Sequence, residues 1–422
     1  MRRFSCSFTV FSLRSAHMST PSTDLAKIEW FLDHAVERIL PDREALKQVL
    51  LSGKRIRVYV GVDPTGPSIH IGHAIGIQKL AEIQELGHDI VLLMGDFTAM
   101  IGDPTDKSAA RKRLTREQVL ENLKGYKDQL SSILKFDGPN PAQIRFNSEW
   151  LGAMSFGDVV ELASHFTVQQ MSERDMFEKR LEEGKPVYLH EFLYPLMQGY
   201  DSVALEVDME IGGNDQTFNM LAGRTLLREM KGKEKFVLAT KLLADASGKK
   251  MGKTEGNMIA LADTPEDAYG KIMSWTDGMI LPGYEMLTQT AKNERDEIAA
   301  KIAAGENPMT YKKQLAERVV AWCFGSEAAA KAAEHFASVH QQGELPEEII
   351  EYTRASGEVA LLDALVEAGV VPSKSEARRQ VEQNAVKVNG EVVSDVKATI
   401  HVTKDGVLLQ KGKRSFVKVI GL

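Results

Sequence analysis

The 422-residue sequence contains only two cysteines, Cys6 and Cys323. Two cysteines this far apart make neither a disulfide framework nor a cysteine-based zinc site, and their scarcity fits a reducing compartment. No apolar run approaches the roughly 18 residues that a membrane span requires, so we expect no transmembrane helix. The chain also lacks internal repeats and low-complexity tracts. Its length predicts two or three domains.

Acidic residues are absent before Asp24, whereas Arg2, Arg3 and Arg14 lie there among serines and apolar residues. A basic, serine-rich, acid-poor start is typical of a transit peptide. The alternative is an over-long start, with Met18 as the true initiator. We therefore expect a cytoplasmic protein, or a mitochondrial or other organellar one if residues 1–23 are a transit peptide. In either case this segment is a disordered or targeting extension.

The net charge of −7 argues against a chain that coats nucleic acid indiscriminately. Residues Gly357–Leu422 nevertheless hold ten Lys or Arg against eight Asp or Glu, a net charge of +2, which leaves −9 for the remainder. A polyanion is therefore expected to dock near the C-terminus.

One βαβ unit can be recognised near the N-terminus. Residues Arg57–Val62 alternate and are β-branched, which predicts a strand, and Asp63–Pro67 follow as a loop. Apolar residues at helical spacing then predict a helix from His70 to about Leu86. The apolar run Asp89–Asp96 is typical of a buried parallel strand. Together they indicate a doubly wound, Rossmann-type α/β sheet.

The middle of the chain mixes helices with apolar segments. A helix is expected from Thr115 to about Lys135, and a return to the sheet near Ala204–Val207. Asp263–Asp267 contain proline and acidic residues typical of a helix start, and helical segments continue to about Gln342. We expect a connector at Gln341–Pro346, followed by one more acidic helix.

The C-terminal segment predicts a compact module of its own. Leu361–Ala368 is expected to be helical, and Ser373–Glu376 forms a capping box for a second helix. Val386–Val392 predicts two strands joined by an Asn-Gly turn.

The tetrapeptide His70-Ile71-Gly72-His73 lies where the βαβ strand turns into its helix. The positive end of that helix favours phosphate, the two histidines can donate to phosphate oxygens, and Gly72 leaves room for a flat ring. A zinc site would need a third ligand nearby, and no Cys- or His-rich segment supplies one. The tetrapeptide alone is a weak signal.

A second basic element, Ser247–Thr254, is punctuated by glycines and carries three lysines. Such a loop suits a mobile clamp over polyphosphate charge. It is not a P-loop, because Gly248 and Gly252 enclose three residues instead of four and no apolar strand directly precedes them. The alternative for this segment by itself is a solvated basic loop.

The order and spacing of these two elements resemble the HIGH and KMSKS motifs of class I aminoacyl-tRNA synthetases, some 180 residues apart. The chain from about Ile28 to Leu422 is similar to the tyrosyl-tRNA synthetase family within that class, and its last module resembles an S4-type RNA-binding domain. Four further segments carry the likeness to this family: Tyr59–Thr65, Thr98–Pro104, Tyr194–Asp201 and Ile211–Gln216.

The resemblance implies a division of the chain into parts. These are a Rossmann-type catalytic domain (24–255) with a dimer-interface insert at about 130–190, an α-helical anticodon-binding domain (256–345), a linker (346–356) and a small α+β S4-like domain (357–422). A homodimer is implied as well.

The resemblance also implies the reaction: tyrosine is activated with ATP, and the tyrosyl group passes to tRNA. Catalytic roles fall on His70, His73, Lys250, Lys253 and Thr65. Contacts to ATP fall on Gly61, Asp63, Thr65, His70, Gly72, His73, Gly213, Asp215, Lys250, Met251, Lys253 and Thr254. Contacts to tyrosine fall on Tyr59, Thr98, Asp103, Tyr194, Gln198, Asp201 and Gln216, and contacts to tRNA on Lys374, Arg378, Arg379 and Lys387. Mg²⁺ is expected on the phosphate oxygens of ATP, with no protein metal site.

Chemistry explains why such residues suit these places. Recognition of tyrosine over phenylalanine requires a buried partner for the phenol, and such sites discriminate by roughly 10⁴–10⁵. Taken one at a time, however, Tyr59 and Tyr194 could be core aromatics, Asp103 a turn former and Asp215 a helix cap.

The likeness to the family has two departures. Gly252 replaces the serine of the usual lysine motif, which leaves the lysines intact, and Glu210 stands where some relatives have glutamine, so that its role is open. Three rival hypotheses are a tryptophanyl enzyme, a non-catalytic RNA-binding protein on the same scaffold, and a different HIGH-type nucleotidyltransferase.

Overall fold

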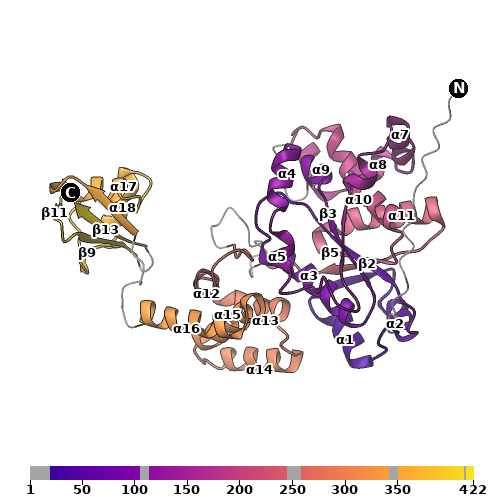
Figure 1. Ribbon diagram of the computed structural model, residues 1–422, viewed down its shortest axis with the longest axis horizontal. Helices are drawn as coiled ribbons and strands as arrows, with labels where there is room; N and C mark the ends of the chain where they lie inside the picture. The colour runs from indigo at the N-terminus through magenta and orange to yellow at the C-terminus, as the bar shows by residue number, and fades with distance from the viewer. Residues whose placement is uncertain (1–19, 105–113, 245–257, 342–349, 413–414) are drawn as a thin grey trace. The chain divides into compact units, whose positions relative to one another are not determined.

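A computed structural model describes residues 20–104, 114–244, 258–341, 350–412 and 415–422 of the chain. The chain forms two compact units, one ending at Ala330 and the other beginning at Lys331. Figure 1 labels the helices and strands of both. Among the described residues, no helix has the length and apolarity that crossing a membrane would require.

A six-stranded sheet forms the centre of the first unit, in the order β1-β6-β5-β2-β3-β4. The five strands β2 to β6 are parallel, and β1 is antiparallel at the edge. This arrangement confirms the predicted doubly wound α/β fold. The strands are β1 (Val36–Leu40), β2 (Arg57–Val62), β3 (Asp89–Met94), β4 (Gln143–Phe146), β5 (Met209–Gly213) and β6 (Phe236–Thr240).

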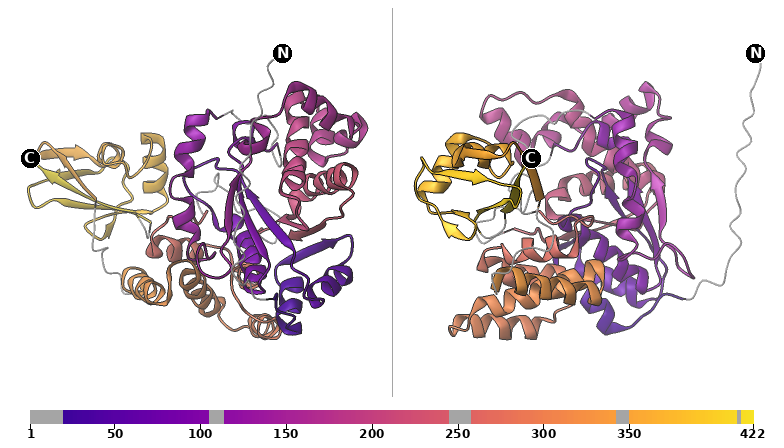
Figure 2. Two further views of the ribbon diagram at one scale, coloured as in Figure 1. Left: turned by 45° about the vertical axis from the view of Figure 1, so that its right-hand side comes forward. Right: turned by 60° about the vertical axis from the view of Figure 1, so that its left-hand side comes forward.

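Helices lie on both sides of this sheet (Figure 2). They bury the apolar side chains of the strands, as parallel sheets require. The helices of this part are α1 (Leu25–Asp33), α2 (Arg43–Leu51), α3 (Ile71–Glu85), α4 (Arg116–Leu123), α5 (Tyr126–Leu130), α6 (Ser148–Leu151), α7 (Phe156–Ser164), α8 (Val168–Ser172), α9 (Asp175–Glu182), α10 (Leu189–Leu205) and α11 (Thr217–Lys231). Short 3₁₀ turns η1 (Thr98–Met100) and η2 (Asn214–Gln216) follow β3 and β5.

The predicted βαβ unit is confirmed. β2 has the predicted bounds, α3 begins directly after His70, and β3 pairs with β2 in parallel register from Arg57↔Asp89 onward. The expected helix after Thr115 does begin there with a capping box, but Gly125 in the left-handed conformation (φ 82°) divides it into α4 and α5.

The chain does return to the sheet, but later than the Ala204–Val207 segment near which this was predicted. α10 continues to Leu205, Glu206 ends it in the left-handed conformation, and the strand begins at Met209. A short apolar run reads equally well as a buried helix end or as a strand, and here Leu205 and Val207 pack in the core beside the sheet.

The rest of the first unit is helical. Thr264 caps α12 through the backbone N–H of Asp267 and Pro265 occupies its first turn, which confirms the predicted helix start. The helices are α12 (Pro265–Met273), α13 (Ile280–Leu287), α14 (Lys292–Ala303) and α15 (Pro308–Phe324), with the 3₁₀ turn η4 (Asp277–Met279) between the first two. A last helix, α16 (Ser326–Gln341), begins in this unit and continues into the second.

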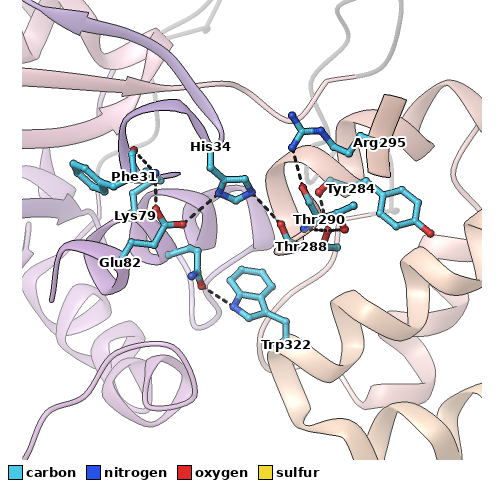
Figure 3. A network of polar contacts seen from close by, with 10 residues as sticks. Phe31, His34, Lys79, Glu82, Tyr284, Thr288, Thr290, Arg295 and Trp322 are labelled. Carbon is cyan, nitrogen blue, oxygen red and sulfur yellow. Dashed lines mark hydrogen bonds and ion pairs between the residues drawn. The ribbon is translucent and has the colours of Figure 1, made fainter. Parts of the chain in front are cut away.

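A buried polar network joins α3 to these helices (Figure 3). Lys79 donates to the carbonyl oxygen of Phe31 and pairs with Glu82, both at 2.5 Å. His34 places Nδ1 3.3 Å from Glu82 Oε1 and Nε2 3.0 Å from the carbonyl oxygen of Thr288. Both ring nitrogens of His34 therefore face acceptor oxygens. The network therefore fixes the C-terminal half of α3, whose first turn carries the histidine motif.

Burial raises the pKa of the Glu82 carboxyl, but the charge of Lys79 and the hydrogen bonds from His34 and Lys79 together outweigh burial and leave this pKa lowered. Removing one partner of a buried ion pair leaves the other charge buried without a counter-charge. We expect Glu82→Gln to lower the free energy of unfolding by about 3 kcal/mol. Urea denaturation measures this, with Glu85→Gln on the exposed side of α3 as a near-neutral control. Equal effects of the two substitutions would contradict this assignment.

The second unit contains a small mixed fold with its own core around Leu365, Val381 and Leu409. One sheet has the order β10-β9-β12-β13-β7, and β8 pairs with β11. The elements are β7 (Ile350–Arg354), β8 (Gly357–Ala360), α17 (Leu361–Glu367), α18 (Lys374–Glu382), β9 (Val386–Val388), β10 (Glu391–Val392), β11 (Thr399–Val402), β12 (Val407–Lys411) and β13 (Ser415–Gly421).

Most local predictions for this module are confirmed. Ser373 caps α18 through the backbone N–H of Glu376, and β9 and β10 form a hairpin in which Asn389 and Gly390 both have positive φ. The acidic helix expected after Pro346 is wrong over Ile350–Arg354, because that segment is strand β7, paired with β13.

Candidate active site

The cavity of interest lies at the carboxyl ends of the parallel strands, where the sheet changes direction. β2 is flanked by β3 on one side and β5 on the other, so that the strand order reverses at this point. Ligands of doubly wound sheets bind in the crevice at such a switch point. A cavity of about 740 Å³ is present there.

All the predicted site residues of the described part of the first unit line this single cavity. They come from β2 and its loop, the start of α3, the turns after β3 and β5, and α10. They are Tyr59, Gly61, Asp63, Thr65, His70, Gly72, His73, Thr98, Asp103, Tyr194, Gln198, Asp201, Gly213, Asp215 and Gln216. The predicted residues Lys250, Met251, Lys253 and Thr254 lie outside the described residues.

The histidine pair is built into the first turn of α3. His70 is the N-cap, and its Nδ1 lies 3.3 Å from the backbone N–H of His73, from which it accepts. The two imidazole rings stack with centroids 3.7 Å apart. A Cβ at Gly72 would lie 3.1 Å from the His70 ring, so glycine lets this ring fold against the backbone. The helix start thus presents two imidazoles and the positive end of its dipole to the cavity.

Both flanks of the lysine segment reach the same cavity. Leu242 and Leu243 line it on one side of the segment, and Met258 and Ile259 on the other. The backbone N–H of Ile71 donates to the carbonyl oxygen of Ile259 at 2.9 Å. The chain that leaves the lysine segment is therefore bonded directly to the start of α3.

Tyr59 and Asp201 are almost completely buried, with exposures of 1% and 3%. Asp201 accepts from Trp150 Nε1 at 2.7 Å and from Asn147 Nδ2 at 3.3 Å. Each carboxylate oxygen keeps a further lone pair beyond these bonds. Asp201 is therefore held rigidly while it remains able to accept another hydrogen.

Burial raises the pKa of Asp201 well above its ordinary range, and the hydrogen bonds from Trp150 and Asn147 offset part of this rise. Burial likewise raises the pKa of the Tyr59 phenol, with the negative charges of Glu210 and Asp201 adding to it. The pair is a desolvated polar site, in which an unpaired hydroxyl or carboxylate is costly.

Asp63 is hydrogen-bonded to two residues that were predicted to bind the other substrate. Its carboxylate accepts from the Tyr194 hydroxyl at 2.8 Å and from the Thr98 hydroxyl at 2.7 Å. A Cβ at Gly95 would lie 2.0 Å from Asp63 Oδ1, so only glycine fits there. Asp63, predicted for ATP, is thus joined to the predicted tyrosine contacts Tyr194 and Thr98.

A second acid, Asp103, is held from two sides. Arg174 donates to its Oδ1 at 3.0 Å, and Gln216 donates to its Oδ2 at 2.7 Å. Asn219 donates to both Gln216 Oε1 at 3.0 Å and Gln198 Oε1 at 2.9 Å. The predicted tyrosine contacts Asp103, Gln198 and Gln216 therefore belong to one hydrogen-bonded wall of the cavity.

Several residues of this site were missed by the sequence analysis. Asn147 and Trp150 follow the carboxyl end of β4, and polar residues directly after that strand were an available signal. Arg174, 5% exposed, comes from the α8–α9 region, where no sequence pattern pointed to the cavity.

No group of three or more His, Cys, Asp or Glu side chains in the described part of the chain could hold a metal ion. Of the predicted tRNA contacts, Lys374, Arg378 and Arg379 are exposed on α18, and Lys387 is half-buried on β9. Lys374 pairs with Asp363 and Arg379 with Glu376.

Comparison with known proteins gives matches along the chain. Residues 51–341 match the family tRNA synthetases class I (W and Y), and residues 342–419 match the tyrosine–tRNA ligase SYY-like C-terminal domain. The chain therefore belongs to the class I tRNA synthetases that comprise the tryptophan and tyrosine enzymes.

Its relatives are tyrosine–tRNA ligases. Those of Moorella thermoacetica and Carboxydothermus hydrogenoformans are each 42% identical, over 393 and 411 residues. These alignments span 92% and 95% of this chain and 94% and 99% of the relatives. A C-terminally truncated mitochondrial tyrosyl-tRNA synthetase of Coccidioides posadasii has a similar crystal structure, with TM-score 0.59 and 26% identity over 73% of this chain and 91% of that one. Within the family, this chain falls in the tyrosine branch.

Proposed function

We propose that this chain activates L-tyrosine with ATP and transfers the tyrosyl group to the 3′-terminal adenosine of tyrosine tRNA. The observation that carries the proposal is a single cavity lined by both the histidine pair at the start of α3 and the buried pair Tyr59 and Asp201. The histidines suit a polyphosphate, and the buried pair suits a phenol. An indole offers no hydroxyl to the buried pair, which argues against the tryptophan branch.

The first step needs no general base, because the carboxylate of tyrosine is ionised at neutral pH. Its oxygen attacks the α-phosphorus of ATP, and pyrophosphate leaves with the electron pair of the broken P–O bond. Catalysis then consists of positioning and of stabilising negative charge on the polyphosphate. We assign the stabilisation of that negative charge to His70, His73, Lys250 and Lys253, helped by Thr65 in the neighbouring loop.

The remaining predicted residues are assigned to the rest of the substrates. We assign Gly61, Asp63, Gly72, Gly213 and Asp215, together with Met251 and Thr254, to ATP. Thr98, Asp103, Tyr194, Gln198 and Gln216 are assigned to tyrosine. In our proposal Mg²⁺ enters on the phosphate oxygens of ATP, where it shields their charge. In the second step a ribose hydroxyl of the tRNA attacks the tyrosyl carbonyl, AMP leaves with the electron pair of the broken C–O bond, and the hydroxyl proton passes to the AMP phosphate or to water.

Transfer to tRNA gives a direct test of the proposal. The chain, incubated with ATP, Mg²⁺, labelled tyrosine and tyrosine tRNA, is expected to yield an ester that mild alkali hydrolyses. Label on the tRNA with tryptophan in place of tyrosine would contradict the proposal, and so would a failure to charge any tRNA.

We propose that α18 and β9 of the second unit contact the tRNA backbone through Lys374, Arg378, Arg379 and Lys387. Because Arg378 is exposed, Arg378→Ala is expected to raise the KM for tRNA several-fold and to lower the salt dependence of tRNA binding by about one unit of slope. Tyrosine-dependent ATP–pyrophosphate exchange is expected to stay unchanged. Lys404→Ala, another exposed lysine of the same unit, is the control. An unchanged KM and salt slope would remove Arg378 from this contact.

We also propose that the chain forms a homodimer through the region of residues 130–190. Of 14 large hydrophobic side chains that are exposed in the described residues, six lie between Phe156 and Leu189, and these two are each 84% exposed. Exposed apolar side chains that cluster in this way are typical of a surface that a protein partner covers. Leu189→Asp is expected to shift a dimer to monomer in sedimentation velocity, whereas Leu25→Asp, 53% exposed at α1, is expected to have no effect. A dimer unaffected by Leu189→Asp would refute this interface.

The cytoplasmic location stays a prediction, as does the transit-peptide alternative for residues 1–23. Expression of the chain with a C-terminal fluorescent tag, with and without residues 1–17, distinguishes them.

A further inference from the structure

A buried charged cluster lies behind Tyr59 and has no assigned role. It consists of Glu210 on β5, Ser202 on α10 and Lys235 directly before β6, with exposures of 2%, 0% and 1%. Lys235 Nζ donates to Glu210 Oε2 and, at 2.8 Å, to Ser202 Oγ. Neither Lys235 nor Ser202 lines the cavity, whereas Glu210 and Tyr59 do.

The packing makes room for this ammonium group at the crossing of two helices. A Cβ at Gly223 of α11 would lie 2.6 Å from Lys235 Nζ and 2.7 Å from Ser202 Oγ. A Cβ at Gly199 of α10 would lie 2.9 Å from Leu226 Cδ1. Two glycines therefore allow the helices to close around the lysine head group.

Stability alone is a weak reason for this ion pair. Desolvation of two charges offsets most of their attraction, and hydrophobic replacements of buried pairs are often neutral or stabilising. Burial lowers the pKa of Lys235, and the charge and hydrogen bond of Glu210 offset part of that effect. The cluster therefore calls for a role in the neighbouring site.

The donors and acceptors that these side chains offer indicate what that role is. An ammonium group only donates, so the Ser202 oxygen accepts from Lys235. The single hydrogen of Ser202 can then go to Tyr59 Oη at 3.0 Å or to Glu210 Oε2 at 3.4 Å. The contact with Tyr59 is the shorter of the two, and 3.4 Å is longer than an ordinary O–H···O hydrogen bond, so the Ser202 hydrogen is assigned to Tyr59.

If Ser202 donates to Tyr59, the hydrogen of Tyr59 is available to the cavity that Tyr59 lines. Both oxygens of Asp201 already act as acceptors, for Trp150 and Asn147, and each keeps a lone pair for a further hydrogen. The two side chains then offer one donor and one acceptor, which is what a phenol hydroxyl needs. The C–H bond of phenylalanine matches neither.

We propose that Lys235, acting through Ser202, fixes the direction of the hydrogen-bond chain that ends at Tyr59, so that Tyr59 donates to the phenol oxygen of tyrosine while Asp201 accepts its hydrogen. Lys235 and Ser202 are positioning residues in this account, and Glu210 is the counter-charge that holds Lys235 in place. The inference rests on the proposed function.

The test compares variants that separate charge balance from hydrogen donation. Lys235→Met/Glu210→Gln removes both charges and the donor to Ser202, whereas Lys235→Gln/Glu210→Gln removes both charges but keeps an N–H donor. Ser202→Ala removes the relay itself, and Lys233→Met, in the half-exposed pair with Asp208, is the control. The kcat and KM for tyrosine and for phenylalanine are measured by ATP–pyrophosphate exchange, together with the Tm.

Ser202→Ala and Lys235→Met/Glu210→Gln are each expected to lower kcat/KM for tyrosine about tenfold, mainly through KM, with phenylalanine unchanged. Lys235→Gln/Glu210→Gln is expected to keep the preference for tyrosine, as is Lys233→Met. An unchanged preference in Ser202→Ala, or the same preference in the two double variants, would overturn the inference and leave the proposed function intact. Absence of tyrosine-dependent exchange in the unaltered chain would refute the proposed function itself, and the inference with it.

Discussion

Asp201→Ala is expected to lower the preference for tyrosine over phenylalanine about a hundredfold. The substitution removes the only carboxylate that Trp150 and Asn147 hold in the cavity wall, and it leaves a bound phenol without its acceptor. Activity with phenylalanine is expected to persist, because phenylalanine makes no bond that the substitution removes. The ratio of kcat/KM for the two amino acids in ATP–pyrophosphate exchange measures this preference.

The ratio has the advantage that a partly unfolded variant lowers both rates equally. Asp96→Asn is a matched control, because Asp96 is also buried, at 2% exposure, and bonds to Ser148 outside the residues that line the cavity. It is expected to reduce stability without altering the preference. If Asp201→Ala kept the preference of the unaltered chain, Asp201 would have no part in phenol recognition.

Lys253→Ala is expected to slow adenylate formation by about 10²–10³-fold. A cation that stabilises charge growing on the leaving pyrophosphate acts mainly in the transition state, so tyrosine affinity is expected to change little. Although Lys253 lies outside the described residues, Leu243 and Ile259 on either side of its segment line the cavity. Rapid-quench measurement of adenylate and equilibrium dialysis with tyrosine separate the two quantities.

Lys249→Ala is the control for this lysine, because it removes the same charge from the same segment at a position with no assigned contact. Its effect on adenylate formation is expected to be small. Near-normal exchange in Lys253→Ala would show that the lysine does not act on the polyphosphate.

Local patterns predicted the first βαβ unit because its information is local. The alternation over Arg57–Val62, the apolar run that follows Gly87 and the cap at His70 each depend on neighbours in sequence. The Asn389-Gly390 hairpin was predictable for the same reason, since a positive φ at both turn residues restricts the residue types.

Long-range pairing accounts for the errors. The segment Ile350–Arg354 has the charge pattern of a helix surface, but its strand conformation depends on β13, more than 60 residues later. The return to the sheet was predicted too early because the burial of Leu205 and Val207 against Tyr59 cannot be recognised from their sequence neighbours.

The residues of the site could be predicted from the sequence, but the hydrogen bonds between them could not. Motif order brought together fifteen residues that line one cavity, yet the bonds of Asp63 to Thr98 and Tyr194 were not predicted. Lys235 was missed altogether, because a lysine before an apolar strand normally lies at a solvent-exposed strand end. Its burial depends on the close crossing of α10 and α11, which Gly199 and Gly223 allow.

The proposal that this cavity activates tyrosine is tested most directly by ATP–pyrophosphate exchange with each of the twenty amino acids in turn. The structure predicts that tyrosine gives by far the fastest exchange, with a rate for phenylalanine lower by roughly 10⁴ at equal concentration. Exchange stimulated by tryptophan instead of tyrosine, or exchange with none of the twenty, would contradict the account.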